Sequence, residues 1–192
     1  MNLSPKAFKL IVDHEGLNQP GAWPGANSGI TIGYGYDLGY RTMLEFMRDW
    51  QDKLPSNVLQ QLARAIGKRG ADARILAPSF REIRIPKDAS MEVLRINSIP
   101  SYIAETRRVF PGVELLPEDA AGALVSLVYN RGGGMKGDSR REMRAIQKAV
   151  LARDLKEIAA QLRAMKRLWA GKNLGGLLRR RDEEAALVES CI

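Results

Sequence analysis

Residues 30–39 read ITIGYGYDLG, and this stretch decides the class of fold. Its even positions are isoleucine or tyrosine up to Tyr36, and its odd positions are small or polar, which is the alternation of a strand with turn glycines inside it. Residues 16–29 before it are rich in Gly, Pro and Asn and predict a loop. From Thr42 onward the pattern is mostly helical. We therefore expect an α+β fold, predominantly α, with one small β element near the N-terminus.

A helix is predicted over residues 4–15. Ser4 suits the N-cap, Pro5 the first helical position and Gly16 the C-terminal stop. Its apolar residues follow helical spacing, and the next position on the same face is Glu15. The apolar residues are Phe8, Ile11 and Val12.

The remaining helices are read from apolar periodicity and end signals. Ser139 with Glu142, and Asp154 with Glu157, have the spacing of capping boxes. We expect one domain over residues 1–192, with a small hairpin lobe at about 14–50 and a helical lobe formed by the remainder plus the helix at 4–15. The predicted helices lie near 42–52, 55–66, 88–109 with an interruption at Pro100, 117–131, 140–152, 155–170 and 177–189.

Composition limits the function. The chain has 192 residues, a net charge of +8, one cysteine (Cys191) and one histidine (His14). An intrachain disulfide and the usual His/Cys zinc sets are therefore excluded. No apolar run approaches the roughly 18 residues of a membrane span, and no signal peptide is recognised, so synthesis in the cytoplasm is expected. The positive charge serves solubility alone or attracts a polyanion such as nucleic acid, anionic lipid or the bacterial envelope.

Glu15 is the first candidate catalytic residue. Burial at the end of an apolar face would raise the pKa of its carboxyl group towards the range of a general acid. The alternative is a structural glutamate whose side chain reaches water or pairs with an arginine.

Thr31 and Asp37 are the second candidates. A straight strand would separate them by roughly 20 Å at about 3.3 Å per residue, too far to serve one reacting bond. Gly33 and Gly35 permit a tight turn, so we expect a hairpin that brings both residues towards Glu15. The alternative is an ordinary hairpin with incidental polar residues.

These groups suit the hydrolysis of a glycosidic bond. One carboxylic acid protonates the leaving oxygen, which fits Glu15, while a second group positions water or stabilises the transition state, which fits Asp37 and Thr31. Other chemistries lack their motifs: there is no nucleophile elbow, no Walker loop and no complete dinucleotide-binding fingerprint.

Three blocks of sequence together resemble the phage-type lysozymes of glycoside hydrolase family twenty-four, in the branch that includes the muramidase domain of the bacteriocin pesticin. The first block is His14-Glu-Gly-Leu17 with Ser28-Gly-Ile-Thr-Ile-Gly-Tyr-Gly-Tyr-Asp-Leu-Gly39. The others are Ala123-Leu-Val-Ser-Leu-Val-Tyr-Asn-Arg-Gly132 and Gly176-Leu-Leu-Arg-Arg-Arg-Asp-Glu-Glu-Ala-Ala-Leu187.

The resemblance implies a lysozyme-like fold of two lobes with a substrate groove between them. It also implies cleavage of the β-1,4 bond between N-acetylmuramic acid and N-acetylglucosamine, without cofactor or metal. Glu15 matches the catalytic glutamate of the family and Thr31 its threonine. The commonest form has an aspartate where this chain has Pro24, and a histidine where it has Tyr36. The pesticin-like form instead has an aspartate at the position of Asp37, which is therefore expected to be the second carboxylate.

Four residues are candidates for substrate contact: Tyr36, Tyr129, Asn130 and Arg180. For Tyr129 the alternative is a core aromatic residue. The arginines at 179–181 have the alternative of pairing with Glu183 or Glu184. In the family an arginine of this region lies near the catalytic glutamate, and Arg180 is the candidate for it.

The expected partners are peptidoglycan glycan strands, with electrostatic contact to an anionic envelope or membrane; nucleic acid is not expected, and the chain is expected to be monomeric. The basic segment 140–172, which carries Ile158, Leu162, Met165 and Trp169, is either a membrane-active amphipathic face or the solvated face of core-packed helices. As an endolysin the protein would stay in the host cytoplasm until release through holin-type pores and then act on the periplasmic wall; a secreted effector or bacteriocin domain is the alternative.

Two other functions remain open. A lytic transglycosylase would use a single glutamate and form an anhydro-sugar. A non-enzymatic basic module would bind envelope polymers or nucleic acid, although the aromatic residues are not interleaved with the basic ones as stacking on single strands requires. The family resemblance favours inversion over retention, which the separation of the carboxylates would decide.

Overall fold

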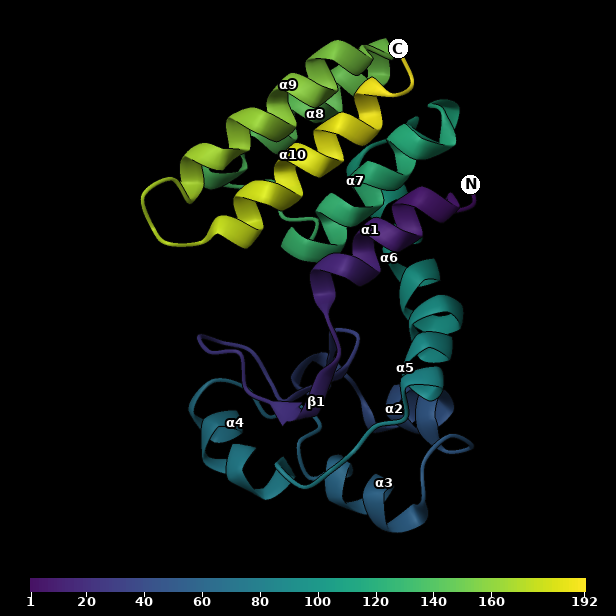
Figure 1. Cartoon of the computed structure of the whole chain (residues 1–192), viewed down its shortest axis with the longest axis vertical. Coiled ribbons are helices and arrows are strands. Elements are labelled where there is room, and N and C mark those ends of the chain that lie inside the picture. Colours follow the sequence, from purple (N-terminus) through teal and green to yellow (C-terminus); the bar gives the residue numbers. More distant parts are fainter. The chain divides into compact units, whose positions relative to one another are not determined.

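A computed structural model describes the backbone of all 192 residues and the side chains of all but residues 18–20. It is 66% helical with a small three-stranded antiparallel sheet, so the predicted α+β fold dominated by helices is confirmed. The chain forms two compact units (Figure 1). Residues 15–100 form the central unit, and residues 1–14 with 101–192 form the terminal unit.

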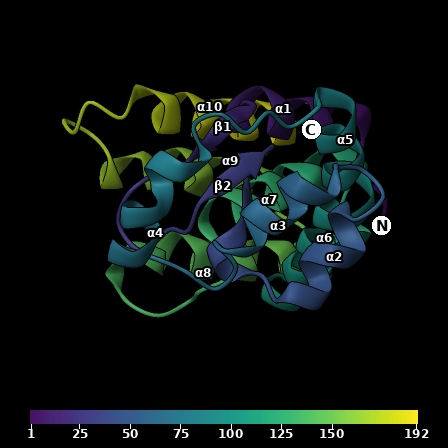
Figure 2. The ribbon, with the colours of Figure 1, turned by 90° about the horizontal axis from the view of Figure 1, so that it is seen from below.

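The sheet belongs to the central unit. Its strands are β1 (Asn18–Ala22), β2 (Thr31–Gly33) and β3 (Tyr36–Asp37), in the order β1-β2-β3. β1 and β2 lie side by side (Figure 2), with Asn18 opposite Gly33, Ala22 opposite Thr31 and an irregularity between them. The prediction of a loop over residues 16–29 is wrong at β1. Backbone pairing to β2 defines this strand. Its sequence lacks the apolar alternation by which strands are recognised, so it was not predicted.

The helices of the central unit follow the sheet. The predictions at 42–52 and 55–66 are confirmed, whereas α4 and the two 3-10 turns were not predicted. The elements are η1 (Leu38–Tyr40), α2 (Met43–Trp50), α3 (Ser56–Ala63), α4 (Ala71–Leu76), η2 (Ala77–Phe80), α5 (Lys87–Val93) and the π-helical η3 (Leu94–Ser98).

One core joins these helices to the sheet. Ile30 and Ile32 from the sheet region are fully buried with Phe46, Trp50 and Phe80 from the helical elements. The small lobe was expected to end near residue 50. The unit extends to Pro100 because the later helices bury their apolar residues against this same core.

Pro100 does not interrupt the helix over 87–109. The helix runs through α5 and η3 into α6 (Ile99–Val109), with Pro100 as the second residue of α6. Proline cannot donate a backbone hydrogen bond, and a π-helical turn is one way in which a helix adjusts its bonding next to such a residue. The predicted break is therefore replaced by η3.

The terminal unit is helical, and α7 (Glu118–Arg131) is its most buried helix, with ten buried residues. Its small and branched apolar residues let neighbouring helices approach on several sides. α10 packs against α7 and α9, and α9 packs against α8 (Figure 1). The other elements are α1 (Pro5–Glu15), η4 (Val113–Leu115), η5 (Asp138–Arg140), α8 (Arg141–Ala152), α9 (Leu155–Ala164), η6 (Met165–Leu168) and α10 (Gly175–Glu189).

The helix caps were predicted in part. The Ser4 hydroxyl accepts the Ala7 N–H (3.2 Å), as expected, and the Asp154 carboxylate accepts the Glu157 N–H (3.0 Å), which is one of the two hydrogen bonds of the predicted capping box. The capping box at Ser139 is wrong, because α8 begins after Arg140 and has no side-chain cap.

The basic segment 140–172 packs into the core. Ile158, Leu162 and Met165 are buried, so they do not form an exposed membrane-active face. Many of its cations are paired: Lys166 with Asp182 (2.8 Å) and Arg167 with Glu142.

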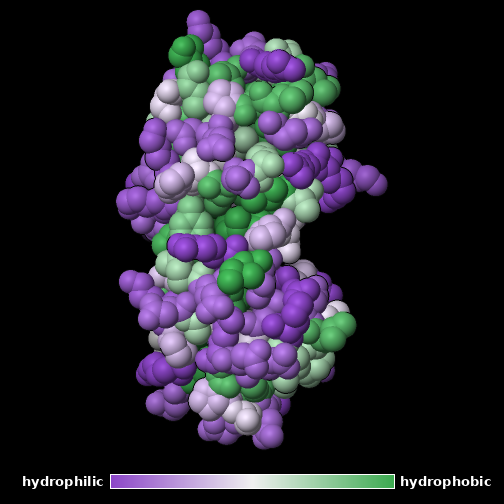
Figure 3. Space-filling view, turned by 90° about the vertical axis from the view of Figure 1, so that its right-hand side faces the viewer, coloured by the Kyte–Doolittle hydropathy of each residue, from purple (hydrophilic) through white to green (hydrophobic). Residues whose placement is uncertain are grey.

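Hydrophilic residues cover most of the face seen in Figure 3, with hydrophobic residues in scattered patches. Within the described residues, no helix is long and apolar enough to cross a membrane.

Candidate functional site

The candidate site centres on the hairpin formed by β2 and β3. Thr31 lies opposite Asp37 and Ile32 opposite Tyr36. Gly33 (φ +53°) and Gly35 (φ +74°) take up left-handed backbone in the connection, a conformation that glycine adopts without strain. The predicted hairpin around Gly33–Gly35 is confirmed. Directly opposed residues place their Cβ atoms about 5 Å apart, so the Thr31 hydroxyl and the Asp37 carboxylate share one small area.

The Asp37 carboxylate is held by backbone N–H groups on two sides. The Gly29 N–H donates to both of its oxygens (3.0 and 3.1 Å), and the Gly39 N–H donates to Oδ1 (2.8 Å), which also caps η1. Burial raises the pKa of this half-buried carboxyl group above its ordinary value of 3.8, although the hydrogen bonds from Gly39 and Gly29 act in the opposite direction. The carboxylate is therefore fixed in position and more basic than a solvated aspartate.

Two glycines make this arrangement possible. A Cβ atom on Gly29 would lie 2.3 Å from Asp37 Oδ1, and a Cβ atom on Gly39 would lie 2.7 Å from the Gly29 Cα. No larger residue fits at either position without moving the backbone. These glycines belong to the site as much as Asp37 does, whereas the sequence analysis placed Gly29 in a loop and Gly39 at the end of the strand-like stretch and gave neither a role in the site.

Thr31 is 6% exposed. No hydrogen bond of its hydroxyl oxygen to the other described side chains is found. A hydroxyl with free bonding capacity beside a fixed carboxylate can hold a water molecule.

Glu15 ends α1 and is partly buried. Gly16 follows with φ +62° and stops the helix, as predicted. Asn18 is three positions after Glu15, so their Cα atoms lie within about 11 Å, and Asn18 pairs with Gly33. Glu15 thus belongs to the same compact unit as the hairpin and lies a short length of chain from it.

Tyr36 lies in the core, which corrects its predicted role in substrate contact. Its ring is 2% exposed and packs edge-on against Trp50, with 5.4 Å between centroids. Its hydroxyl donates to Asp49 Oδ2 (2.9 Å). Burial, followed by this hydrogen bond, raises the pKa of the phenol above its ordinary value of 10.0. Strand alternation places Tyr36 on the face opposite Asp37, and that face is the buried one.

Tyr129, Asn130 and Arg180 lie in the terminal unit. Tyr129 is buried with its ring 4.3 Å from that of Tyr102, and Asn130 is partly buried at the end of α7. Arg180 is 2% exposed and donates to the Ser126 hydroxyl (3.1 Å) and the Ser126 carbonyl (3.2 Å). These placements make Tyr129 and Arg180 internal side chains of the unit.

The predicted pairing of the arginines at 179–181 with glutamates is confirmed. Arg179 pairs with Glu183 (3.7 Å), while Arg180 (3.3 Å) and Arg181 (2.8 Å) share Glu184. Ser126 of α7 donates to the same Glu184 oxygen (2.6 Å). The sequence did not identify Ser126 as a member of this cluster, because the two residues are 58 positions apart.

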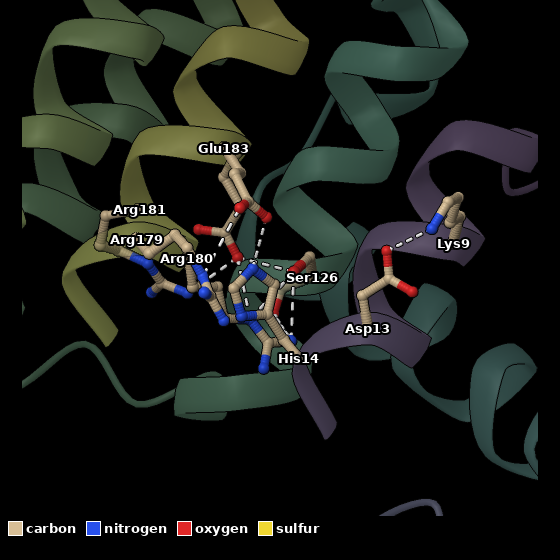
Figure 4. Close-up of polar contacts among 9 residues, drawn as sticks. Lys9, Asp13, His14, Ser126, Arg179, Arg180, Arg181 and Glu183 are labelled. Carbon is tan, nitrogen blue, oxygen red and sulfur yellow. Dashed lines mark hydrogen bonds and ion pairs between the residues drawn. The ribbon is translucent and has the colours of Figure 1, made fainter. Parts of the chain in front are cut away.

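His14 also has a partner that was not predicted. Its Nε2 lies 2.6 Å from Glu183 Oε2, and the two side chains face each other in Figure 4, where Lys9 and Asp13 form a separate pair along α1. Among the side chains that the structure describes, no group of three or more His, Cys, Asp or Glu residues could hold a metal ion.

Comparison with known protein families gives a match to part of the chain. Residues 19–109 are similar to a family described as a domain of unknown function, DUF8812. No curated protein sequence matches the chain. The matched range includes Thr31 and Asp37 and leaves Glu15 outside it.

Proposed function

We propose that the protein is a muramidase that hydrolyses the β-1,4 bond between N-acetylmuramic acid and N-acetylglucosamine in peptidoglycan. In this proposal Glu15 protonates the leaving oxygen, while Thr31 and Asp37 hold the attacking water and stabilise the transition state. The resemblance of three sequence blocks to phage-type lysozymes names the substrate.

The observation that carries the proposal is the pairing of Thr31 with Asp37 across the hairpin. A carboxylate offers about four acceptor positions, and two backbone N–H groups leave capacity for a water molecule at Asp37. The Thr31 hydroxyl, on the residue opposite Asp37, supplies a second contact that orients the same water.

The raised pKa of Asp37 supports the role of a base. A carboxylate that binds a proton more tightly than a solvated aspartate is a better acceptor for the proton of an attacking water. Its backbone hydrogen bonds also fix its direction, so that no reorientation is needed during the reaction.

The test is the loss of turbidity of purified peptidoglycan. Glu15→Gln should reduce the rate by about 10²- to 10⁴-fold, the range expected for loss of a general acid. Asp13→Asn is the matched control, since Asp13 is an exposed carboxylate two positions away in α1 whose partner is Lys9. Circular dichroism must show that both variants fold. An unchanged rate in Glu15→Gln would remove the catalytic role of this residue.

Thr31→Val and Asp37→Asn test the second half of the site. Each substitution should slow cleavage. The rate of Glu15→Gln gives the lower limit with which both rates are compared. Product masses distinguish the reaction class: hydrolysis adds one water at the cut, whereas a lytic transglycosylase yields anhydro-sugars that lack it. Wall binding without any cleavage by the wild-type chain would instead indicate a binding module.

A further inference from the structure

Three large apolar residues are exposed within five positions of the central unit, where η1 ends and α2 begins. Tyr40 is 58%, Met43 47% and Leu44 81% exposed. Single exposed apolar residues need no explanation, but a group of them marks a candidate binding surface.

Tyr40 differs from its neighbours because its ring is held in place. Its hydroxyl donates to the Asn27 carbonyl (3.2 Å), and the Arg69 guanidinium lies 4.9 Å from the ring centroid. The hydroxyl and the ring of Tyr40 therefore each have a contact that holds them, although more than half of the residue is exposed to solvent. An exposed aromatic ring that is already ordered loses little entropy when a ligand packs on it.

The backbone beneath the ring is equally constrained. A Cβ atom on Gly39 would lie 2.6 Å from both Arg69 Cγ and the Lys68 carbonyl oxygen. The Gly67 N–H donates to the Leu38 carbonyl (3.1 Å). The turn that carries Tyr40 and the segment that carries Arg69 are thus locked together.

This surface adjoins the candidate site. The Gly39 N–H that binds Asp37 belongs to the residue directly before Tyr40. At about 2 Å per residue in a 3-10 turn, the Cα atoms of Asp37 and Tyr40 are separated by roughly 6 Å along the turn axis. An extended polymer bound at Asp37 can therefore also reach Tyr40.

We propose that Tyr40 and Arg69 form a binding platform for one sugar ring of a carboxylate-bearing glycan strand. The tyrosine ring gives an apolar surface with a polar edge, which matches the C–H face and hydroxyl edge of a sugar. Arg69 and the neighbouring Lys68 favour an anionic ligand, and the guanidinium binds carboxylates with paired hydrogen bonds. The identification of this glycan as peptidoglycan rests on the proposed function.

The test is co-sedimentation of the full chain with purified insoluble peptidoglycan, using Glu15→Gln as the background so that the polymer stays intact. Tyr40→Ala should weaken binding about 3- to 10-fold, the range expected when one aromatic contact is lost. Tyr40→Phe keeps the ring but loses the hydrogen bond to the Asn27 carbonyl, so it should weaken binding less than Tyr40→Ala does. Ile75→Ala is the matched control, because it removes an exposed apolar side chain of α4 that does not belong to this surface.

The outcomes separate this platform from the catalytic proposal. Weaker binding by Tyr40→Ala alone supports the platform even if the wild-type chain cleaves no peptidoglycan. Cleavage by the wild-type chain together with unchanged binding by a folded Tyr40→Ala overturns the platform and leaves the muramidase proposal standing. Equal losses in Tyr40→Ala and Ile75→Ala mean general apolar adhesion, and no binding by the background protein means no site; either result overturns the platform.

Discussion

At the scale of single residues, Asp37 couples the candidate site to pH. Burial raises the pKa of its carboxyl group, so the folded chain holds this proton more tightly than the unfolded chain. The stability that it contributes is fully present below pH 3.8 and is lost as the pH rises through the higher folded pKa. We expect the melting temperature of the wild type, minus that of Asp37→Asn, to decrease over this window.

The subtraction is needed because other carboxyl groups act in the opposite direction. Hydrogen bonds from Thr42 lower the pKa of Glu45, and those from Ser4 and Lys6 lower the pKa of Asp119. Both groups are present in wild type and variant alike and cancel in the difference. Calorimetry between pH 3 and 7 measures it, and a difference that grows with pH would contradict the raised pKa.

Gly39 gives a second prediction at this scale. Gly39→Ala should destabilise the protein by about 1–3 kcal/mol, because the new Cβ atom meets backbone atoms of Lys68 and Gly29, which cannot turn away as a side chain would. Gly176→Ala is the control, since this helical glycine has open space around it and alanine favours helices. Urea unfolding measures the stability of both variants. Equal free energies of unfolding would show that the backbone around Gly39 can move to accommodate a Cβ atom at little cost.

At the scale of elements, α10 tests the difference between buried and exposed charge pairs. Glu184 is fully buried and shared by Arg180 and Arg181, whereas Glu189 pairs with Arg163 in a more exposed position. Glu184→Gln should cost about 3–5 kcal/mol because it removes the carboxylate that pairs with the fully buried Arg181 guanidinium. Glu189→Gln should cost at most about 1 kcal/mol. Denaturant unfolding compares the same substitution on one helix, and similar losses would refute the distinction.

The elements also show how far the sequence leads. α1 was predictable because its cap, its apolar spacing and its terminal glycine agree, and the hairpin because two glycines stand between Thr31 and Asp37. β1 was not predictable, since backbone pairing leaves no apolar pattern. α4 has six residues and follows Gly70 without a side-chain cap, so it offers few local signals.

The candidate site was also predictable only where local sequence determines it. Local chemistry and spacing identified Thr31 and Asp37 and placed them together. Burial depends on the rest of the chain, which is why Tyr36 was expected to contact substrate and lies inside. The contact of Tyr40 with Arg69 joins residues 29 positions apart and has no local signature.

At the scale of the whole molecule, the two units differ in how the chain builds them. The central unit is one continuous segment, residues 15–100, whereas the terminal unit combines residues 1–14 with residues 101–192. The central segment also has its own core, which includes Phe46, Trp50 and Phe80. A continuous segment with a complete core meets the requirements for independent folding.

We therefore expect residues 15–100 to fold when produced alone, with a cooperative thermal transition and a blue-shifted emission from the buried Trp50. At 86 residues the segment buries a smaller share of its surface than a large domain, so its stability should be only a few kcal/mol. The matched fragment is residues 101–192, which lacks α1 and the buried Ala7 and Ile11 that this helix contributes, and should unfold less cooperatively. A central fragment without a cooperative transition would show that its core depends on the rest of the chain.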